Sequence, residues 1–489
     1  MIKHIHIIGS GFSSLAASCY LAKAGYKVSV LEKNSTLGGR ARQYKKDGFT
    51  FDIGPSWYWM PDVFERFFAD FGKKPSDYYL LDKLNPGYEV YFDEKDSVKI
   101  SSSLKDIYSL FEKEEKGSAK YLKEFLNSAK SNYDTAIKDL VYKPGISPLE
   151  LVNTTTISRV SQFFSTIRKQ VRKNIRSKRL IQILEFPVLF LGAKPSNTPA
   201  FYNFMNYADF GLGTWHPRGG MYTVIEGMVS LAESLGVHFT TNANVDKIIV
   251  DDKNNAVKYL IVNGTELKSD LVLSGADYHH TETLLNEDYK QYSEKYWDKK
   301  TFAPSSLLFY VGFDKKIENV SHHTLFFDTD FDEHAKEIYD NPKWPKAPLF
   351  YANFTSITDK TSAPEGKEAG FFLIPLAPGI EDTEELREQY FHKIMDRFEK
   401  LTNQKVKGHV LFKKSFCVED FKNEYNSYKG NAYGMANTLF QTAFLRPKIK
   451  SSKVNNLYFT GQLTVPGPGV PPALISGKIA SELIIKNQN

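Results

Sequence analysis

The sequence predicts an α/β protein, α+β overall, in which a Rossmann-like unit is joined to a second, mixed sheet. Residues 5–40 read as an apolar strand, a glycine turn, a helix of small residues and a second strand. Residues 216–290 and 450–489 return to alternating helices and strands. Residues 305–375 have the alternating pattern of sheet strands, which predicts the separate sheet.

The first turn carries the fingerprint of a dinucleotide-binding site. Gly9 and Gly11 leave bare backbone at the tight turn, so a pyrophosphate can approach the positive end of the next helix. Glu32 ends the second strand, where a carboxylate can accept hydrogen bonds from a ribose. Ser14 replaces the third glycine and is still small. The alternative is a glycine-rich turn of an ordinary α/β fold; the strand–turn–helix–strand context favours a bound dinucleotide.

The length and composition of the sequence exclude some classes of protein. A chain of 489 residues exceeds one core, so two or three structural regions are expected. Its net charge of +6 is compatible with anionic membrane surfaces. Cys19 and Cys417 are the only cysteines, which excludes a cysteine-rich metal site, and we expect no bound metal. The apolar stretch 180–193 is too short and too interrupted to span a bilayer. We expect a cytoplasmic protein without a secretory signal, attached to a membrane only peripherally.

The residues after Glu32 point to FAD. The motif Leu37-Gly38-Gly39-Arg40-Ala41 lets the chain curl over a tightly held cofactor, with Arg40 near the pyrophosphate. Together with the first glycines, this motif resembles the amine-oxidase-like FAD superfamily. The C-terminal LYFTGQLTVPGPGVPPALISGKIA resembles the closing element of that superfamily. The resemblance implies that a strand ending at Gly461 returns to the pyrophosphate and that the next helix points its N-terminus at the flavin.

Over its whole length the sequence is similar to the bacterial carotenoid desaturases of the phytoene desaturase type. The similarity rests on FDIGPSW at 51–57, WHPRGGM at 215–221, GNAYG at 430–434 and PGPGV at 466–470. It is closest to flavobacterial members, which include phytoene desaturases and a 1′-hydroxycarotenoid 3,4-desaturase, and the motifs do not separate these two. Residues 461–466 depart from the family's histidine-containing loop beside the flavin, which leaves the exact substrate open.

This resemblance implies an FAD-dependent oxidoreductase of carotenoid biosynthesis that introduces C=C bonds into a long polyene by hydride transfer to flavin. Quinone or oxygen would reoxidise the flavin. Such chemistry needs a long, dry tunnel rather than a strong nucleophile. The residues expected to hold the cofactor come from both ends of the chain: Gly9, Gly11, Phe12, Ser13, Glu32, Lys33, Gly39, Arg40, Gly54, Pro55, Ser56, Val245 (through its backbone, at the adenine), Gly461 and Val470.

The sequence offers fewer candidates for catalytic residues. His216 is a candidate general base, with a hydrogen-bonded loop histidine as the alternative. Asp52 is expected to brace the loop that faces the flavin. The aromatic side chains Trp57, Tyr58 and Trp59 are candidates for the substrate tunnel, with packing between domains as the alternative.

The expected organisation has three regions. An FAD-binding domain combines residues 1–75, 214–290 and 450–489, and a substrate domain with a sheet combines 76–103 and 291–449. Residues 104–213 form a helical region that is expected to associate with a membrane.

A basic segment within the helical region supports that expectation. Eight basic and no acidic residues lie between Arg159 and Arg179, with apolar residues three or four apart. This pattern predicts a basic amphipathic helix on an anionic bilayer surface. The alternative is a solvated basic face packed on the protein's own core. Nucleic acid is not an expected partner, because no known binding module accompanies the charges. The residues expected at the membrane surface are Arg168, Lys169, Arg172 and Lys173.

Two other functions share the expected fold. The first is an amine oxidase or protoporphyrinogen oxidase, against which stands the lack of an evident aromatic cage or flavin-linking cysteine. The second is a non-catalytic protein that binds prenylated partners, such as a GDP-dissociation inhibitor. The intact pyrophosphate motifs at both ends of the chain argue against the second function.

Overall fold

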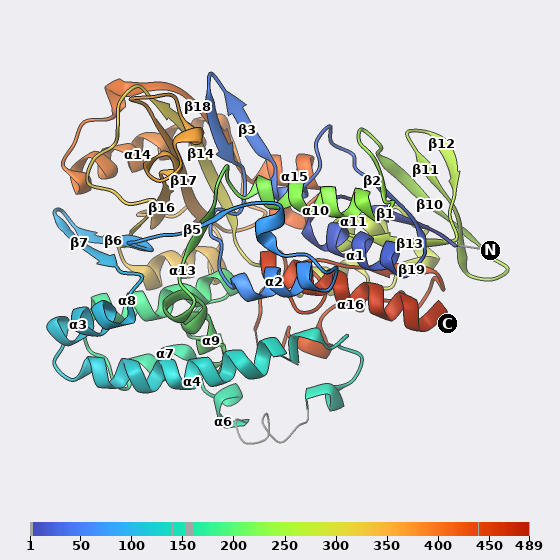
Figure 1. Cartoon of the computed structure of the whole chain (residues 1–489), viewed down its shortest axis with the longest axis horizontal. Helices are drawn as coiled ribbons and strands as arrows, with labels where there is room; N and C mark the ends of the chain where they lie inside the picture. Colours follow the sequence, from blue (N-terminus) through green and yellow to red (C-terminus); the bar gives the residue numbers. More distant parts are fainter. Residues whose placement is uncertain (1–2, 139, 152–159, 439, 489) are drawn as a thin grey trace.

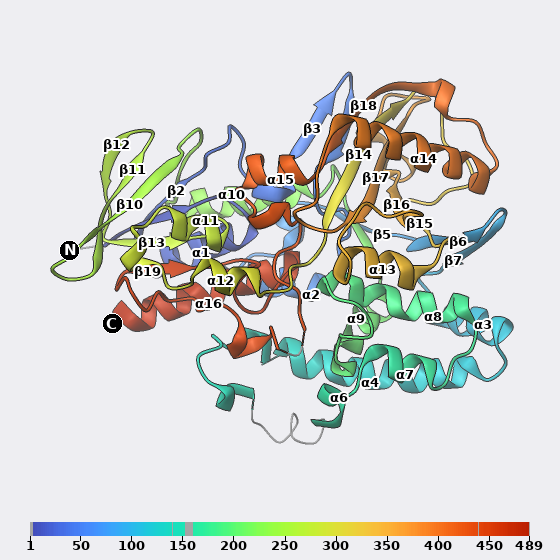
Figure 2. The same cartoon turned by 180° about the vertical axis from the view of Figure 1, so that it is seen from behind.

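The computed structural model describes residues 3–138, 140–151, 160–438 and 440–488. A parallel sheet and a mixed sheet lie at opposite ends of the molecule, and a layer of helices runs beneath the mixed sheet (Figures 1 and 2). The chain crosses between these parts several times, so that residues from its two ends meet in the parallel sheet.

The predicted Rossmann-like unit forms a five-stranded parallel sheet. Its strand order is β19-β13-β1-β2-β9, and each neighbouring pair is parallel. The strands are β1 His4–Ile8, β2 Lys27–Leu31, β9 His238–Thr240, β13 Leu271–Ser274 and β19 Leu457–Phe459. An antiparallel meander follows β9 and consists of β10 Val245–Asp251, β11 Ala256–Val262 and β12 Thr265–Lys268.

The first and last helices of the chain pack against each other. Helix α1 (Phe12–Lys23) contacts α16 (Val470–Gln488) and also α10 (Tyr222–Ser234). The contact is close because Gly477 has no side chain: a Cβ there would lie 2.3 Å from the carbonyl oxygen of Ser13. Residues separated by most of the sequence thus form one wall of the nucleotide-binding half.

The second sheet has seven strands in the order β18-β14-β17-β16-β15-β6-β7. All neighbouring pairs are antiparallel except β15 and β6, which makes the sheet mixed, as predicted. The strands are β6 Tyr88–Asp93, β7 Asp96–Ile100, β14 Ser305–Phe313, β15 His323–Phe326, β16 Phe350–Asn353, β17 Glu368–Leu376 and β18 Val410–Phe416.

The two faces of this sheet have different roles. Helix α14 (Glu384–Thr402) shares an apolar core with Leu307 and Phe309 of β14. Because strand side chains alternate, Ser306 and Leu308 point the other way and line a cavity. Helix α14 begins after Thr383, whose hydroxyl accepts a hydrogen bond from the backbone of Leu386.

The helical layer is more divided than the sequence predicts. Residues 104–140 form two main helices, separated near Gly117, whose φ of +88° ends regular helix. The expected single basic helix is wrong: Thr166 and Ser177 each accept a backbone hydrogen bond at a new helix start and so divide the segment. Arg159 lies outside the described residues. The helices are α3 Leu104–Glu114, α4 Ser118–Lys138, α6 Val160–Phe164, α7 Ile167–Arg172, α8 Lys178–Glu185 and α9 Phe204–Asn206.

Short elements connect these parts. Two small antiparallel ladders pair β3 with β4 and β5 with β8. Within the described residues, no helix combines the length and apolarity needed to cross a bilayer. The division into three domains stays a prediction. The remaining helices and strands are β3 Gln43–Lys46, β4 Phe49–Asp52, α2 Pro61–Ala69, β5 Leu81–Lys83, β8 Trp215–Pro217, α11 Tyr278–Thr283, α12 Glu294–Asp298, α13 Phe331–Tyr339 and α15 Val418–Tyr425.

Candidate active site

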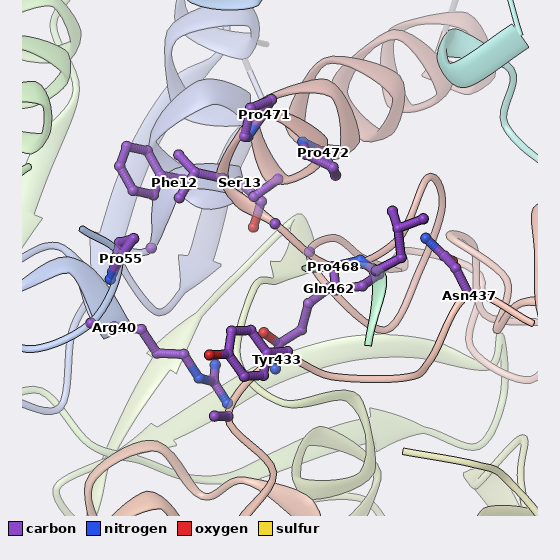
Figure 3. Close-up of a pocket in the computed structure, with 18 of the residues that line it drawn as sticks. Phe12, Ser13, Arg40, Pro55, Tyr433, Asn437, Gln462, Pro468, Pro471 and Pro472 are labelled. Atoms are coloured by element: carbon purple, nitrogen blue, oxygen red, sulfur yellow. The ribbon is translucent and has the colours of Figure 1, made fainter. Parts of the chain in front are cut away.

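One cavity of about 610 Å³ runs from the parallel sheet to the mixed sheet. Every residue expected to hold the cofactor lines it, although these residues come from distant parts of the sequence. Figure 3 shows Phe12 and Ser13 at the start of α1, Pro471 and Pro472 at the start of α16, and Arg40 reaching in from another side. The cavity therefore has a wall built from two helix N-termini and one partly buried cation.

The glycine turn leaves room at the start of α1. Gly11 is the N-cap of this helix, has no side-chain cap and has an ordinary extended conformation (φ −71°). A Cβ on Gly11 would meet no protein atom within 4 Å, so the space before it is open. Gly39 closes over the turn, since its own Cβ would lie 3.1 Å from the Cα of Gly11. Free backbone N–H groups at a helix N-terminus, with open space before them, suit a phosphate group.

Glu32 is held at the cavity wall in a fixed position. Its Oε2 accepts hydrogen bonds from the backbone N–H (3.0 Å) and the hydroxyl (2.6 Å) of Ser10. Its Oε1 accepts from the backbone of Asn34 at 2.9 Å. The neighbouring Lys33 lines the cavity and donates to the carbonyl of Asn423 at 2.7 Å. These bonds orient a carboxylate that can still accept a ribose hydroxyl.

Arg40 places a positive charge in the wall of the cavity. Its NH2 group donates to the hydroxyl of Ser427 at 3.0 Å, and its guanidinium lies 5.2 Å from the centre of the Tyr425 ring. With its amide oxygen facing Arg40, Gln462 accepts from NH2 at 3.0 Å. The buried Nε has no partner among the described residues. Burial lowers the pKa of Arg40, and the charge of Asp277 opposes that shift. An anionic ligand would supply the missing partner.

The loop after β4 packs directly on the Arg40 segment. A Cβ on Gly54 would lie 2.0 Å from the carbonyl oxygen of Arg40, so only glycine fits there. Asp52 braces this loop, as expected: its carboxylate accepts from the backbone of Met221 (2.7 Å) and Tyr222 (3.2 Å) at the start of α10. Burial raises the pKa of Asp52 to about 6, and these hydrogen bonds oppose the shift.

The loop before α16 closes the opposite side. Gly461 has a φ of +104°, and its backbone donates to the hydroxyl of Ser476 at 2.9 Å. The buried Arg446 holds the same loop by donating to the carbonyls of Gln462 (2.7 Å) and Thr464 (2.8 Å). Val470 lines the cavity at the first turn of α16. Residues 461–470 are therefore fixed from both sides.

The other arm of the cavity is apolar. Trp57 and Trp59, two of the candidates for the tunnel, line this arm, and Trp59 donates its indole N–H to the hydroxyl of Thr214 at 2.8 Å. Helices, 3₁₀ turns and the mixed sheet provide the remaining wall. Its apolar side chains include Phe186, Leu189, Leu191, Phe201, Phe204, Met205, Leu308, Leu325, Phe327, Phe331, Ile338, Leu349 and Leu373.

Two expectations need correction. Tyr58 points away from the cavity: its ring stacks on Phe64 (4.3 Å between centroids) and its hydroxyl meets that of Tyr79 at 2.9 Å. Successive residues of an extended segment face opposite sides, which is why Tyr58 differs from its two neighbours. His216 does not line the cavity either; its Nε2 lies 3.0 Å from the Oδ2 of Asp359 in the interior. His216 is therefore excluded as a base in direct contact with substrate.

The residues expected at the membrane have mixed surroundings. Arg172 donates to Glu185 at 2.8 Å, and Arg168 forms an ion pair with Asp332. Both cations thus belong to ion pairs of the fold, and Glu185 is buried beside them. Lys169 and Lys173 are exposed. The sequence pattern did not predict these carboxylate partners, because both lie outside the basic segment.

A buried acid lies behind the apolar arm. Asp209 accepts a hydrogen bond from the hydroxyl of Tyr88 at 2.8 Å, and Tyr88 packs against Trp57 and Phe186. Burial raises the pKa of Asp209 to about 8, which the Tyr88 hydrogen bond only partly opposes. The folded protein therefore keeps a proton on Asp209 at neutral pH that the unfolded chain has lost.

This proton makes stability depend on pH. Because the folded-state pKa is raised, the native state is favoured below the ordinary carboxyl pKa and loses stability as the pH rises toward about 8. The free energy of unfolding falls by about 1.4 kcal/mol for each unit by which the pKa in the folded state exceeds that in the unfolded state. We expect thermal unfolding measured at about pH 5 and about pH 8.5 to show a falling midpoint. In Asp209→Asn the difference between the two unfolding midpoints should be smaller than in the wild type. An equal difference in both proteins would contradict this account.

Some other residues of the cavity wall have no role predicted from the sequence. Tyr351 lines the cavity from β16, and Asn437 lines it from a loop, as does Tyr433 of the GNAYG motif. A tyrosine in an alternating strand does not reveal which face it occupies. Among the described residues, no cluster of His, Cys, Asp and Glu is suited to hold a metal ion.

The fold and this cavity together define a dinucleotide-binding oxidoreductase whose cofactor site opens into an apolar tunnel. The sequence model for flavin-containing amine oxidoreductases matches residues 12–485. The chain is 41% identical to a carotenoid 3,4-desaturase of Haloarcula japonica, over 99% of this chain and 98% of that protein. It is 31% identical to a 4,4′-diapophytoene desaturase (4,4′-diaponeurosporene-forming) of Staphylococcus aureus, over 99% of each.

The chain belongs to the flavin-containing amine oxidoreductase family and, within it, to the carotenoid desaturases. A crystal structure of an oxidoreductase from Methanosarcina mazei has the same fold, with a TM-score of 0.63, 17% identity, and coverage of 98% of this chain and 100% of that one. FAD is accordingly the cofactor that the glycine turn, Glu32 and Arg40 fit.

Proposed function

We propose that this protein is an FAD-dependent carotenoid desaturase that introduces a 3,4 double bond into a long polyene. The observation that carries the proposal is a single cavity in which the nucleotide-binding wall continues into an apolar arm. The 41% identity to a carotenoid 3,4-desaturase over nearly the full length of both chains supports the position of the new bond. An acyclic phytoene-type substrate is the alternative, supported by the 31% identity to a diapophytoene desaturase.

Each part of the cavity has a task in this reaction. Gly11, Gly39 and Arg40 would hold the pyrophosphate, and Glu32 the ribose. When bound, FAD supplies a hydride acceptor. The apolar arm orients the polyene against that cofactor and excludes water. The indole and phenyl rings of the wall, such as Trp57 and Phe186, offer flat surfaces to a conjugated chain.

The test is the reaction itself. Purified protein with FAD is incubated with phosphatidylcholine vesicles that contain phytoene or a 1′-hydroxylated carotenoid. We expect the absorption of the hydroxylated substrate to shift to longer wavelength, with a product lighter by two hydrogens by mass spectrometry. Conversion of phytoene alone would assign the alternative substrate, and a flavin-free protein inactive on both would refute the function.

We also propose that the protein takes its substrate from a membrane through an apolar rim. Three large apolar side chains are mostly exposed: Ile146 (60%), Leu149 (75%) and Phe164 (76%). Their neighbours Ser147 and Phe163 line the cavity, so the exposed side chains stand next to its wall. Helix α6 lies at the lower edge of Figure 1. Lys169 and Lys173 would add attraction to anionic lipid.

Removing part of this rim should weaken membrane binding. Burying one such side chain in lipid is worth about 1.5–3 kcal/mol, so Leu149→Ser with Phe164→Ser should reduce the vesicle partition coefficient at least about tenfold. Sedimentation with neutral and anionic vesicles measures the effect. The matched control is Leu411→Ser with Ile357→Ser, two exposed apolar residues on other elements. Equal loss in both double variants would contradict a specific rim.

A further inference from the structure

A chain of hydrogen bonds leads from the cavity wall into the protein interior. Ser56 and Tyr351 line the cavity, and their hydroxyl oxygens lie 2.9 Å apart. The Tyr351 hydroxyl also lies 2.7 Å from Nδ1 of His323, which is fully buried. Ser56 follows Gly54 and Pro55, so the chain begins beside residues expected to contact the cofactor. Ser56 is itself one of the residues expected to hold the cofactor, whereas Tyr351 and His323 are not.

The surroundings of His323 determine which group donates in each of these hydrogen bonds. Asn353, its cross-strand partner, places Nδ2 at 3.3 Å from the same Nδ1. Its amide orientation is set because Oδ1 accepts from the hydroxyl of Thr355 at 2.6 Å and Nδ2 donates to the carbonyl of His322. An amide nitrogen only donates, so Nδ1 of His323 is an acceptor. Tyr351 therefore donates to His323, and Ser56 donates to Tyr351.

Beyond His323, two further imidazole rings follow in edge and tilted contacts. The centroids of His323 and His322 are 4.5 Å apart, and those of His322 and His216 are 4.7 Å apart. His216 meets the carboxylate of Asp359 at 3.0 Å. Thr358 and Lys360, which flank Asp359 in the sequence, are exposed. This series of rings therefore ends near the surface. Nε2 of both His322 and His323 is buried without a partner among the described residues. Such orphaned groups call for a functional explanation.

We propose that Ser56, Tyr351 and His323 form a proton relay that removes the proton released when the substrate is desaturated, with His322, His216 and Asp359 accommodating the charge. This inference rests on the proposed function. A substrate C–H bond breaks and its electron pair becomes the new π bond, while the adjacent carbon loses a hydride to the cofactor. The proton passes to the Ser56 oxygen, the Ser56 proton to Tyr351, and the Tyr351 proton to Nδ1 of His323.

Two features of His323 decide its state before and after the proton transfer. Burial lowers its pKa well below the ordinary histidine value, with the neighbouring His216 acting in the same direction, so the ring is neutral before reaction. The ring is stacked on Trp57, with centroids 4.0 Å apart and planes at 10°. An indole face stabilises a cation above it, which favours the transiently protonated ring. His334 also lines the cavity, but its two ring nitrogens already bond to the backbone of Leu349 and Pro375.

Tyr351→Phe tests the relay because it removes one hydroxyl and leaves the ring. We expect kcat to fall about 100-fold, the lower part of the range for a positioned proton-transfer group, with KM unchanged. The solvent deuterium isotope effect on kcat should differ between the wild type and this variant. Tyr58→Phe is the matched control: it deletes a buried hydroxyl that also has a partner at 2.9 Å but lies outside the cavity. Its kinetics should match the wild type.

A second measurement does not depend on turnover. In holoprotein labelled with ¹⁵N-histidine, one of the 11 histidines should show an acceptor Nδ1 whose signal moves in Tyr351→Phe and stays in Tyr58→Phe. An unchanged histidine spectrum, or wild-type kcat in Tyr351→Phe, would overturn the relay. Wild-type protein that converts no carotenoid would instead overturn the proposed function, and the two failures are therefore distinct.

Discussion

Gly11→Val is expected to yield a folded protein that contains no FAD. The backbone at Gly11 is extended, a conformation open to any residue, and a Cβ there meets no protein atom within 4 Å. The added side chain therefore causes no strain in the protein itself. It fills the space where the α1 N-terminus would meet a pyrophosphate. We expect the affinity for FAD to fall at least about 100-fold, or about 2.7 kcal/mol.

Flavin absorbance after gel filtration, together with a thermal unfolding curve of the apoprotein, measures both halves of this prediction. Gly408→Val is the control, because Gly408 also has open space around it but lies far from the glycine turn, between α14 and β18. That variant should remain yellow. A yellow Gly11→Val protein would show that the cofactor does not approach the start of α1.

Arg40→Met should also release the cofactor, for an electrostatic reason. Arg40 is partly buried, and its buried Nε has no partner among the described residues, so an anionic ligand would complete its interactions. Within the described residues Arg40 makes hydrogen bonds to Ser427 and Gln462 but no ion pair, so its replacement by an apolar side chain leaves no carboxylate without a salt-bridge partner. We therefore expect an unchanged or raised unfolding temperature in the apoprotein and a loss of FAD affinity of at least about 100-fold.

Arg42→Met provides a closely matched control. Arg42 also lies over the Tyr425 ring, at 5.3 Å compared with 5.2 Å for Arg40, but it does not line the cavity and it pairs with Glu424. Titration of each apoprotein with FAD, followed by flavin fluorescence, gives the two affinities. Equal losses of FAD affinity in both variants would mean that any positive charge in this region attracts FAD. They would also mean that Arg40 makes no direct contact with the cofactor.

The nucleotide-binding half could be predicted because its signals are local. Gly9, Gly11 and Glu32 occupy fixed places in one strand–turn–helix–strand unit, and backbone geometry alone gives them meaning. The substrate half carries no comparable signal. Tyr351 and His323 meet only because β15 pairs with β16 in a particular register, and nothing within either strand specifies that register.

The same distinction explains the predictions that were wrong. The sequence WYW suggests three equivalent aromatics, but side-chain alternation turns Tyr58 into the core. The basic segment has the spacing of a single helix, yet Thr166 and Ser177 divide it by capping new helices. His216 stands in a motif shared with carotenoid desaturases and meets Asp359, its partner 143 residues further along, instead of the cavity.

The contact between α1 and α16 has a consequence for how the molecule is made. The floor of the cofactor site depends on this contact, because Ser13 lines the cavity and Gly477 of the last helix packs on the Ser13 carbonyl. On the ribosome, the glycine turn emerges first but must wait for nearly the whole polypeptide before that floor exists. Closing a loop of this length is slow compared with forming local helices. We therefore expect flavin capture to be a late event in biogenesis, after α16 has been synthesised.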